Sequence, residues 1–217
     1  IYFFDYLCVN RHKEQVSIFR KLLQTHEYNQ RVFHSEVPVS LFKKEIQLFT
    51  GVVPFVKYNT YTYKLRNSRV QPLPKGYFIV EINKENTDKY TDFFYANADY
   101  CSKTKLYDVM IFPDVGNIIE MISQKLLHVF CLCGNDQIYG FYFFKDAKMY
   151  YEELEGNTLH FIASIMNCLS PPIFYNGFTK CIQNILKKNE SYQMLLFENV
   201  GHNTILLPMW NQKYSHI

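Results

Sequence analysis

The stretch from Tyr2 to Glu27 constrains the fold most, because in it a strand pattern passes directly into a helix pattern. The strand part reads FFDYLCV and consists almost entirely of residues that favour β-strands. After the polar run NRHKEQ comes VSIFRKLLQTHE, whose apolar residues recur at the three- and four-residue spacing of a helix. These apolar residues are Val16, Phe19, Leu22 and Leu23. The pattern predicts a strand–turn–helix unit.

The turn in this unit has the chemistry of an anion site. A helix that starts directly after a strand leaves its first backbone N–H groups unpaired and partly positive, which suits a phosphate. Arg11, His12 and Lys13 add positive charge to the same turn. Strand–turn–helix units are common, however, and a solvated basic loop is the alternative interpretation of these residues.

The run DYLCVN…QVSIFRKLL resembles the segment NFLCVH…RVAPVLIREI of the N-myristoyltransferases, which are members of the GNAT acyltransferase superfamily. The resemblance implies that the strand bulges beside a thioester and that the backbone amides of Tyr6 and Leu7 hold the thioester oxygen. It also implies that the following turn cradles the phosphates of coenzyme A. The cofactor-binding residues are then Arg11, His12, Lys13, Gln15, Val16 and Ser17.

Later runs resemble the same family. FTGVVPFVKYNTYTYKLRN is similar to the family's YTAGV-LP-P and RYWHRSLN, which line the junction between acyl chain and peptide. SYQMLLFENV resembles FDVFNALDLMEN, and Gly201–His202–Asn203 partly matches the family's GDGH turn. The substrate-binding residues implied are Thr50, Gly51, Tyr61, Tyr63, Asn67 and His202. A half-buried amphipathic strand is the plainer interpretation of the tyrosines.

The catalytic base implied by the resemblance is the C-terminal carboxylate, here that of Ile217. The sequence contains neither GxSxG nor HExxH, and its seven dispersed His residues indicate surface or structural roles. Glu14 stands where the family keeps basic residues. Because a carboxylate repels a pyrophosphate, Glu14 either turns away from the ligand or folds back on the helix start and fills the anion site itself.

Composition narrows the functional classes. The 217 residues, 48% of them hydrophobic, can bury a core in one or two domains. A formal charge of +3 is too small to indicate nucleic acid binding. No apolar run reaches roughly 18 residues, so no membrane span is expected. The chain starts inside a strand pattern without Met or a signal peptide, so we expect a preceding N-terminal part. The expected location is the cytoplasm, with association with a virion as the alternative.

The six cysteines have neither the spacing of a zinc site nor that of a disulfide framework. They are Cys8, Cys101, Cys131, Cys133, Cys168 and Cys181. Cys131 and Cys133 are separated by one residue in an apolar run and therefore share one face of a strand. We interpret the cysteines as reduced, mostly buried thiols and expect no bound metal.

The rest of the chain alternates strand and helix patterns. Strands are expected over 31–39, 58–63, 77–83, 158–168 and 191–200, and a hairpin around Gly134–Asn135–Asp136. Helices are expected over 41–49, 114–124 and 173–188, the second with Asp114 as its cap. Residues 90–105 show no clear period and are expected to form a loop.

The fold class we predict is α/β, with GNAT-like mixed sheets flanked by helices in two halves, of which the first is incomplete. Residues 1–76 would form the coenzyme half, and residues 77–217 the peptide half. The resemblance implies an acyltransferase that moves a long acyl chain from myristoyl-CoA, its co-substrate, to an N-terminal glycine of a protein, without a permanently bound cofactor.

Two alternatives remain open at this stage. A degenerate member of the family could keep the fold as a structural or binding protein within a viral particle or complex. The second alternative is an enzyme that transfers an acetyl group to a small amine, a reaction in which residues 77–217 would have no role.

Overall fold

The computed structural model describes residues 2–4, 9–10, 12, 14–43, 54–66, 70–107, 110–111, 113–168 and 170–214. It divides into two compact units, the N-terminal unit Ile1–Lys57 and the C-terminal unit Tyr58–Ile217. This division falls earlier than the boundary suggested after residue 76, because the strand Thr60–Lys64 pairs with a strand near the end of the chain.

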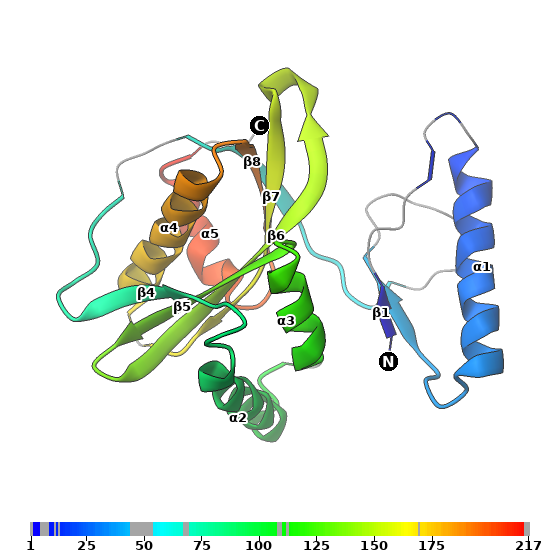
Figure 1. The fold of residues 1–217 in the computed structure, drawn as a ribbon, viewed down its shortest axis with the longest axis horizontal. Helices are drawn as coiled ribbons and strands as arrows, with labels where there is room; N and C mark the ends of the chain where they lie inside the picture. Colours follow the sequence, from blue (N-terminus) through cyan, green and yellow to red (C-terminus); the bar gives the residue numbers. More distant parts are fainter. Residues whose placement is uncertain are drawn as a thin grey trace. The chain divides into compact units, whose positions relative to one another are not determined.

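The N-terminal unit contains a parallel strand pair joined by a long helix (Figure 1). β1 (Tyr2–Phe4) pairs with β2 (Ser40–Phe42), and α1 (Gln15–Phe33) connects them, so the predicted helix is confirmed. The strand expected over 31–39 is wrong, because α1 continues through Phe33. The helix expected over 41–49 is wrong in its first residues, which belong to β2. Its remainder from residue 44 lies outside the described residues.

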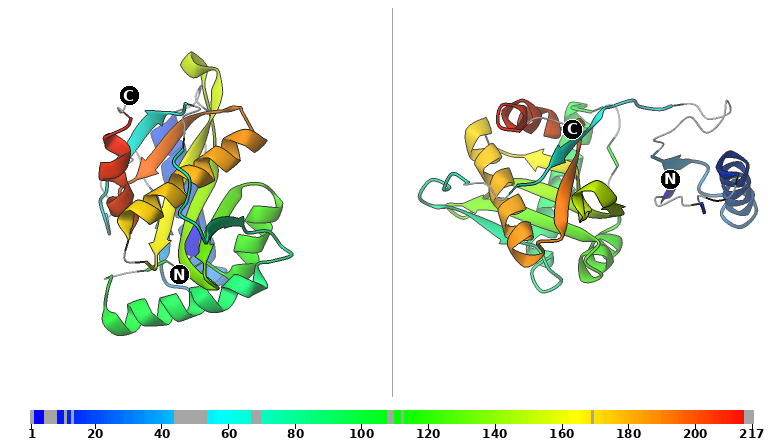
Figure 2. Two further views of the ribbon diagram at one scale, coloured as in Figure 1. Left: turned by 90° about the vertical axis from the view of Figure 1, so that its left-hand side faces the viewer. Right: turned by 90° about the horizontal axis from the view of Figure 1, so that it is seen from above.

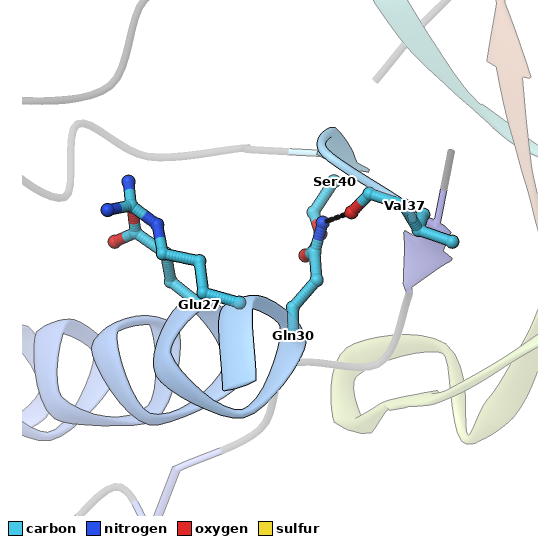
Figure 3. A network of polar contacts seen from close by, with 5 residues as sticks. Glu27, Gln30, Val37 and Ser40 are labelled. Carbon is cyan, nitrogen blue, oxygen red and sulfur yellow. Dashed lines mark hydrogen bonds and ion pairs between the residues drawn. The ribbon is translucent and has the colours of Figure 1, made fainter. Parts of the chain in front are cut away.

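Polar side chains tie α1 to the chain around β2. The buried Gln30 amide donates to the Val37 carbonyl and accepts from the Ser40 hydroxyl (Figure 3). Val16 and Leu22, both expected in the stripe, are 44% and 42% exposed. Phe19 and Leu23, the other two residues of the expected stripe, are half-buried and lie on the same helix face as Gln30, so the spacing predicts part of this face.

The C-terminal unit is built on a six-stranded sheet in the order β3-β8-β7-β6-β5-β4. The strands are β3 (Thr60–Lys64), β4 (Tyr77–Glu81), β5 (Leu127–Gly134), β6 (Gln137–Tyr151), β7 (Gly156–Met166) and β8 (Tyr192–Glu198). The helices are α2 (Asp88–Thr104), α3 (Val115–Ser123), the short 3-10 helix η1 (Glu152–Leu154), α4 (Pro171–Lys188) and α5 (Asn203–Asn211). Neighbouring strands are antiparallel except for β7 and β8, which are parallel and joined by α4.

Each face of this sheet packs a separate core (Figures 1 and 2). On one face α4 and α5 cover an aromatic cluster in which Phe178 lies 5.3 Å from Trp210 and 4.6 Å from Phe161, measured between ring centroids. On the other face α2 and α3 cover a smaller cluster, where Phe94 packs 4.5 Å from Phe141. Burying these rings supplies the main stabilisation of the unit.

Two helices of this unit differ from the expectations. Residues 90–105, expected as a loop, fall almost entirely within α2, which buries only Phe94 and Cys101. Its polar aromatic sequence hides the helical period, and the contact with the second core decides the conformation. α5 was not predicted. It is short and contains Pro208, and burial of its apolar residues, Trp210 among them, holds it in place.

Local signals elsewhere are confirmed. Asp114 caps α3, since its carboxylate accepts from the backbone N–H groups of Gly116 and Asn117 at 2.8 and 3.4 Å. The β5–β6 hairpin turns at Asn135 and Asp136, whose φ angles of 46° and 60° are those of a tight hairpin turn. Within the described ranges, no helix has the length and apolar character needed to cross a bilayer.

Candidate active site

The start of α1 is an open helix N-terminus in the N-terminal unit. Glu14 is the N-cap residue, yet its exposed side chain makes no hydrogen bond to the helix, so it does not fill the anion site from within. Its backbone carbonyl accepts from Ile18 N–H, which begins the helical ladder. The amides of Gln15, Val16 and Ser17 bond to no described residue. These first-turn amides can therefore donate hydrogen bonds to an anion.

The turn before α1 adds one described basic side chain. His12 is exposed, and its backbone N–H donates to Asn10 Oδ1 at 2.9 Å, which orders the turn. Eight predicted site residues lie outside the described residues and stay predictions: Tyr6, Leu7, Arg11, Lys13, Thr50, Gly51, Asn67 and Ile217.

In the C-terminal unit, the parallel strands β7 and β8 separate at their carboxyl ends. They pair from Asn157 with Tyr192 to Phe161 with Phe197, and β7 then runs on to Met166 without a partner in β8. Open α/β sheets bind ligands in the crevice at this end of parallel strands.

His202 fills the gap that this separation leaves. Its Nδ1 accepts from the Met166 backbone N–H at 3.1 Å, and its Nε2 lies 3.2 Å from the Tyr107 hydroxyl. Because Nδ1 accepts, the proton of the neutral ring is assigned to Nε2, which then donates to Tyr107. Burial lowers the pKa of His202 from 6.5, against the opposing effect of the Ser164 backbone carbonyl. Burial likewise raises the pKa of Tyr107.

Asn203 ties together the three elements that meet at this end. It is fully buried; its Oδ1 accepts from the Ser164 hydroxyl of β7 at 2.7 Å, and its Nδ2 donates to the Glu198 carbonyl of β8 at 3.0 Å. As the first residue of α5, it fixes that helix to both strands. The bonds set the spacing of the strand ends, because both partners are backbone or short side-chain groups.

Glu198 also takes part in a buried ionisable pair. His160 Nε2 lies 2.7 Å from Glu198 Oε1, and the two side chains are only 11% and 7% exposed. This is an ion-pair distance, although the direction of approach is not that of a hydrogen bond.

The predicted tyrosines lie on β3, beside β8. Tyr63 is fully buried, its hydroxyl donates to Asn211 Oδ1, and its ring meets Trp210 edge-to-face at 6.0 Å. Burial, and then the neighbouring Tyr61, raises the pKa of Tyr63 to about 12. Tyr61 is half-buried and is the one of the two with surface available to a ligand.

The structure thus places near the ends of β7 and β8 several residues that the sequence did not single out for a role. Asn203 was within the Gly201–His202–Asn203 turn, so a local signal for it existed. Ser164, Glu198 and His160 carried no such signal, because each meets its partner only through pairing of distant strands.

Among the described residues no group of three or more His, Cys, Asp or Glu could hold a metal ion. The five described cysteines are free, and the Sγ atoms of Cys131 and Cys133 lie 3.3 Å apart on one strand face, as the spacing predicts.

The chain has the fold of the N-myristoyltransferases, as comparison with solved structures shows. N-myristoyltransferase of Saccharomyces cerevisiae with bound myristoyl-CoA matches 99% of this chain with a TM-score of 0.60 and 13% identity. The matched region is 56% of the yeast chain, so this chain spans little more than half of that enzyme. The predicted fold class, α/β with a GNAT-like mixed sheet, is confirmed.

Two acetyltransferases resemble parts of the chain more loosely. An aminoglycoside acetyltransferase from an uncultured soil metagenomic sample covers 63% of this chain and 86% of its own, with 12% identity and a TM-score of 0.48. A ribosomal-protein-alanine N-acetyltransferase of Brucella melitensis biovar Abortus 2308 covers 64% and 92%, with 8% identity and a TM-score of 0.45. No protein-family model and no curated protein matches the sequence.

Proposed function

We propose that this protein is an acyl-CoA-dependent acyltransferase that moves a myristoyl or similarly long acyl chain to the N-terminal glycine of a protein. The observation that carries the proposal is the open start of α1, in a chain with the N-myristoyltransferase fold. The sequence resemblance of the strand–turn–helix to that family supports the same assignment.

Coenzyme binding belongs to the N-terminal unit. The amides of Gln15, Val16 and Ser17 would bind the pyrophosphate, with Arg11, His12 and Lys13 supplying positive charge. Glu14 points no hydrogen-bonding group at these amides, so the ligand competes with no internal cap. In the C-terminal unit His202 occupies the gap between β7 and β8, so this gap offers no equivalent site among the described residues.

The acceptor peptide is assigned, on this proposal, chiefly to residues of the C-terminal unit, whereas Thr50 and Gly51 belong to the N-terminal unit. Tyr61 and His202 are the described candidates for contact with it, and Thr50, Gly51 and Asn67 are the further candidates from the sequence. On this proposal the charged coenzyme is assigned to the helix start of α1, and the neutral backbone of the peptide to the other unit.

The chemistry requires little of the side chains. The neutral glycine amine attacks the thioester carbonyl, a C–N bond forms, the C–S bond breaks and coenzyme A leaves as the thiol. The amides of Tyr6 and Leu7 would hold the developing oxyanion. The Ile217 carboxylate would take the proton released by the amine and pass it to the departing sulfur, which makes the thiol. We place this reaction in the cytoplasm, where acyl-CoA and new protein N-termini meet, and association with a virion is compatible with it.

Coenzyme binding is tested first by thermal unfolding with myristoyl-, palmitoyl- and acetyl-CoA. A ligand at a hundredfold excess over its Kd stabilises the folded state by about 2.7 kcal/mol, so the melting temperature should rise with the long-chain thioesters. If none of the three raises it, the coenzyme site is lost and the structural or binding role replaces our proposal.

The helix start is tested by a matched pair of substitutions at Gln15. Gln15→Pro removes one amide donor at the first helical position, where proline is tolerated and the preceding Glu14 is already extended (φ −68°, ψ 94°). Gln15→Ala keeps the donor. We expect weaker coenzyme binding by calorimetry for the proline variant alone. Equal binding by both would show that phosphates bind elsewhere.

Glu14→Gln tests the like-charge effect. Glu14 is exposed, so its repulsion of a phosphate 4 Å away is screened to about 1 kcal/mol. Its removal should therefore tighten coenzyme binding by up to about fivefold. Unchanged affinity would place Glu14 away from the ligand.

A further inference from the structure

A groove of about 630 Å³ lies on the C-terminal unit beside the outermost strand of its sheet. Residues 70–73 form one side, the polar face of α4 forms another, and Tyr77–Ile79 of β4 complete it. Figure 1 shows α4 next to β4 at this edge of the sheet. Its volume is within the range of ligand-binding sites, and the acyl transfer proposed above does not use it.

The backbone of β4 has one side turned away from the sheet. Ile82 N–H donates to the Val129 carbonyl of β5 at 2.8 Å, so Ile82 faces β5. Hydrogen bonding alternates along an antiparallel strand, and the residues at odd distance from Ile82 therefore face outward. These residues are Tyr77, Ile79 and Glu81.

Both ends of this outer edge are capped, and its middle is open. Tyr77 N–H donates to the Pro74 carbonyl at 3.1 Å, and Asn86 Nδ2 donates to the Glu81 carbonyl at 3.0 Å. Between them the N–H and C=O of Ile79 bond to no described residue. An open edge of this kind accepts another extended chain unless the fold protects it.

The groove beside this edge is positively charged. Lys180 and Lys187 are seven residues apart on one face of α4, and both line it. Lys180 Nζ donates to Gln183 Oε1 at 2.8 Å and has no carboxylate partner among the described residues. The nearby Glu81 is neutralised by Lys188, and no described acidic residue lines the groove.

We propose that this α4–β4 groove binds an extended acidic segment of another protein, which adds to the outer edge of β4 as a further strand. The open N–H and C=O of Ile79 would pair with the segment's backbone. Lys180 and Lys187 lie about 10 Å apart along the helix axis, between the roughly 7 Å and 14 Å that separate residues two and four positions apart on one face of a strand. Long side chains on alternate positions of one strand face can therefore reach both lysines.

The test uses the full chain and a fluorescent acetylated peptide that alternates glutamate with valine. We expect saturable binding by fluorescence anisotropy, weakened by salt, and slower hydrogen exchange of the Ile79 amide in the complex. The double variant Lys180→Glu/Lys187→Glu should weaken binding by about tenfold or more. The control Lys89→Glu/Lys125→Glu makes the same charge change at exposed lysines elsewhere and should leave binding unchanged.

Several results would overturn the proposal. A peptide with glutamine in place of glutamate that binds equally well removes the role of charge. Unchanged exchange at Ile79 removes the added strand, even if the peptide binds. Equal loss of affinity in both double variants would show that the net charge of the protein, and not the two lysines of the groove, controls binding. A concentration-dependent dimer that the peptide disrupts would make a second copy of this chain the occupant instead. Because the readouts need no acyl-CoA, failure of the acyl-transfer proposal leaves them unaffected.

Discussion

Replacing Asn203 by alanine should destabilise the C-terminal unit more than any hydrogen bond at the surface. The side chain is fully buried and makes two bonds, at 2.7 Å with the Ser164 hydroxyl and at 3.0 Å with the Glu198 carbonyl. Each bond contributes about 1 kcal/mol net, and a buried carbonyl left without a donor costs a further 1 kcal/mol or more, roughly. The expected loss is therefore about 3 kcal/mol.

The assay follows urea unfolding by the fluorescence of Trp210, the only tryptophan in the chain. It is 2% exposed in the core under α4 and α5, so its signal reports on the C-terminal unit rather than on the whole chain. With a denaturant slope of about 2 kcal/mol/M, the unfolding midpoint of Asn203→Ala should fall by about 1.5 M.

Two further variants make the result interpretable. Ser164→Ala removes one of the two bonds and should cost about 1 kcal/mol, and the double variant with Asn203→Ala should show a coupling of about 1 kcal/mol. Thr204→Ala removes an exposed bond to the Gly201 carbonyl (2.8 Å) and should change stability by less than about 0.5 kcal/mol. If Asn203→Ala costs no more than Thr204→Ala, the bridge between the strand ends does not hold the unit together.

The remaining predictions concern the pH dependence and the packing of the same unit. Burial lowers the pKa of His202 below 6.5 in the folded state, so the unfolded state binds more protons as the pH falls below 6.5. Stability should be full above that pH and decline below it, and His202→Ala should flatten the decline in urea unfolding, although His128, whose pKa is also lowered by burial, keeps part of it. An unchanged slope in the variant would contradict the assignment. Gly177→Ala would place a Cβ 2.4 Å from the Tyr142 hydroxyl, which is itself bonded to the Phe174 carbonyl, so we expect a loss of about 1–3 kcal/mol. A melting temperature equal to that of the unmodified protein would show that Tyr142 moves without cost.

Local chemistry determined a large part of this protein before any tertiary contact was known. The Asn135–Asp136 turn could be predicted because these residue types tolerate the positive φ of a tight hairpin turn, and the cap at Asp114 because its carboxylate reaches the nearby amides. The helix that follows the first strand could also be predicted, because its apolar period repeats within a few residues.

The tertiary structure decided what depends on residues far apart in the chain. The bonds that Gln30 makes to the chain around β2 could not be predicted from the apolar spacing of α1, and α2 is a helix because Phe94 and Cys101 find a core to cover. The candidate site follows the same rule. His202 could be picked out from its turn, but the bridge from Ser164 to Asn203 and the pair of His160 with Glu198 exist only because β7 and β8 run side by side and then separate. A sequence records the residue types that such contacts use, whereas the pairing of distant strands decides which of them meet.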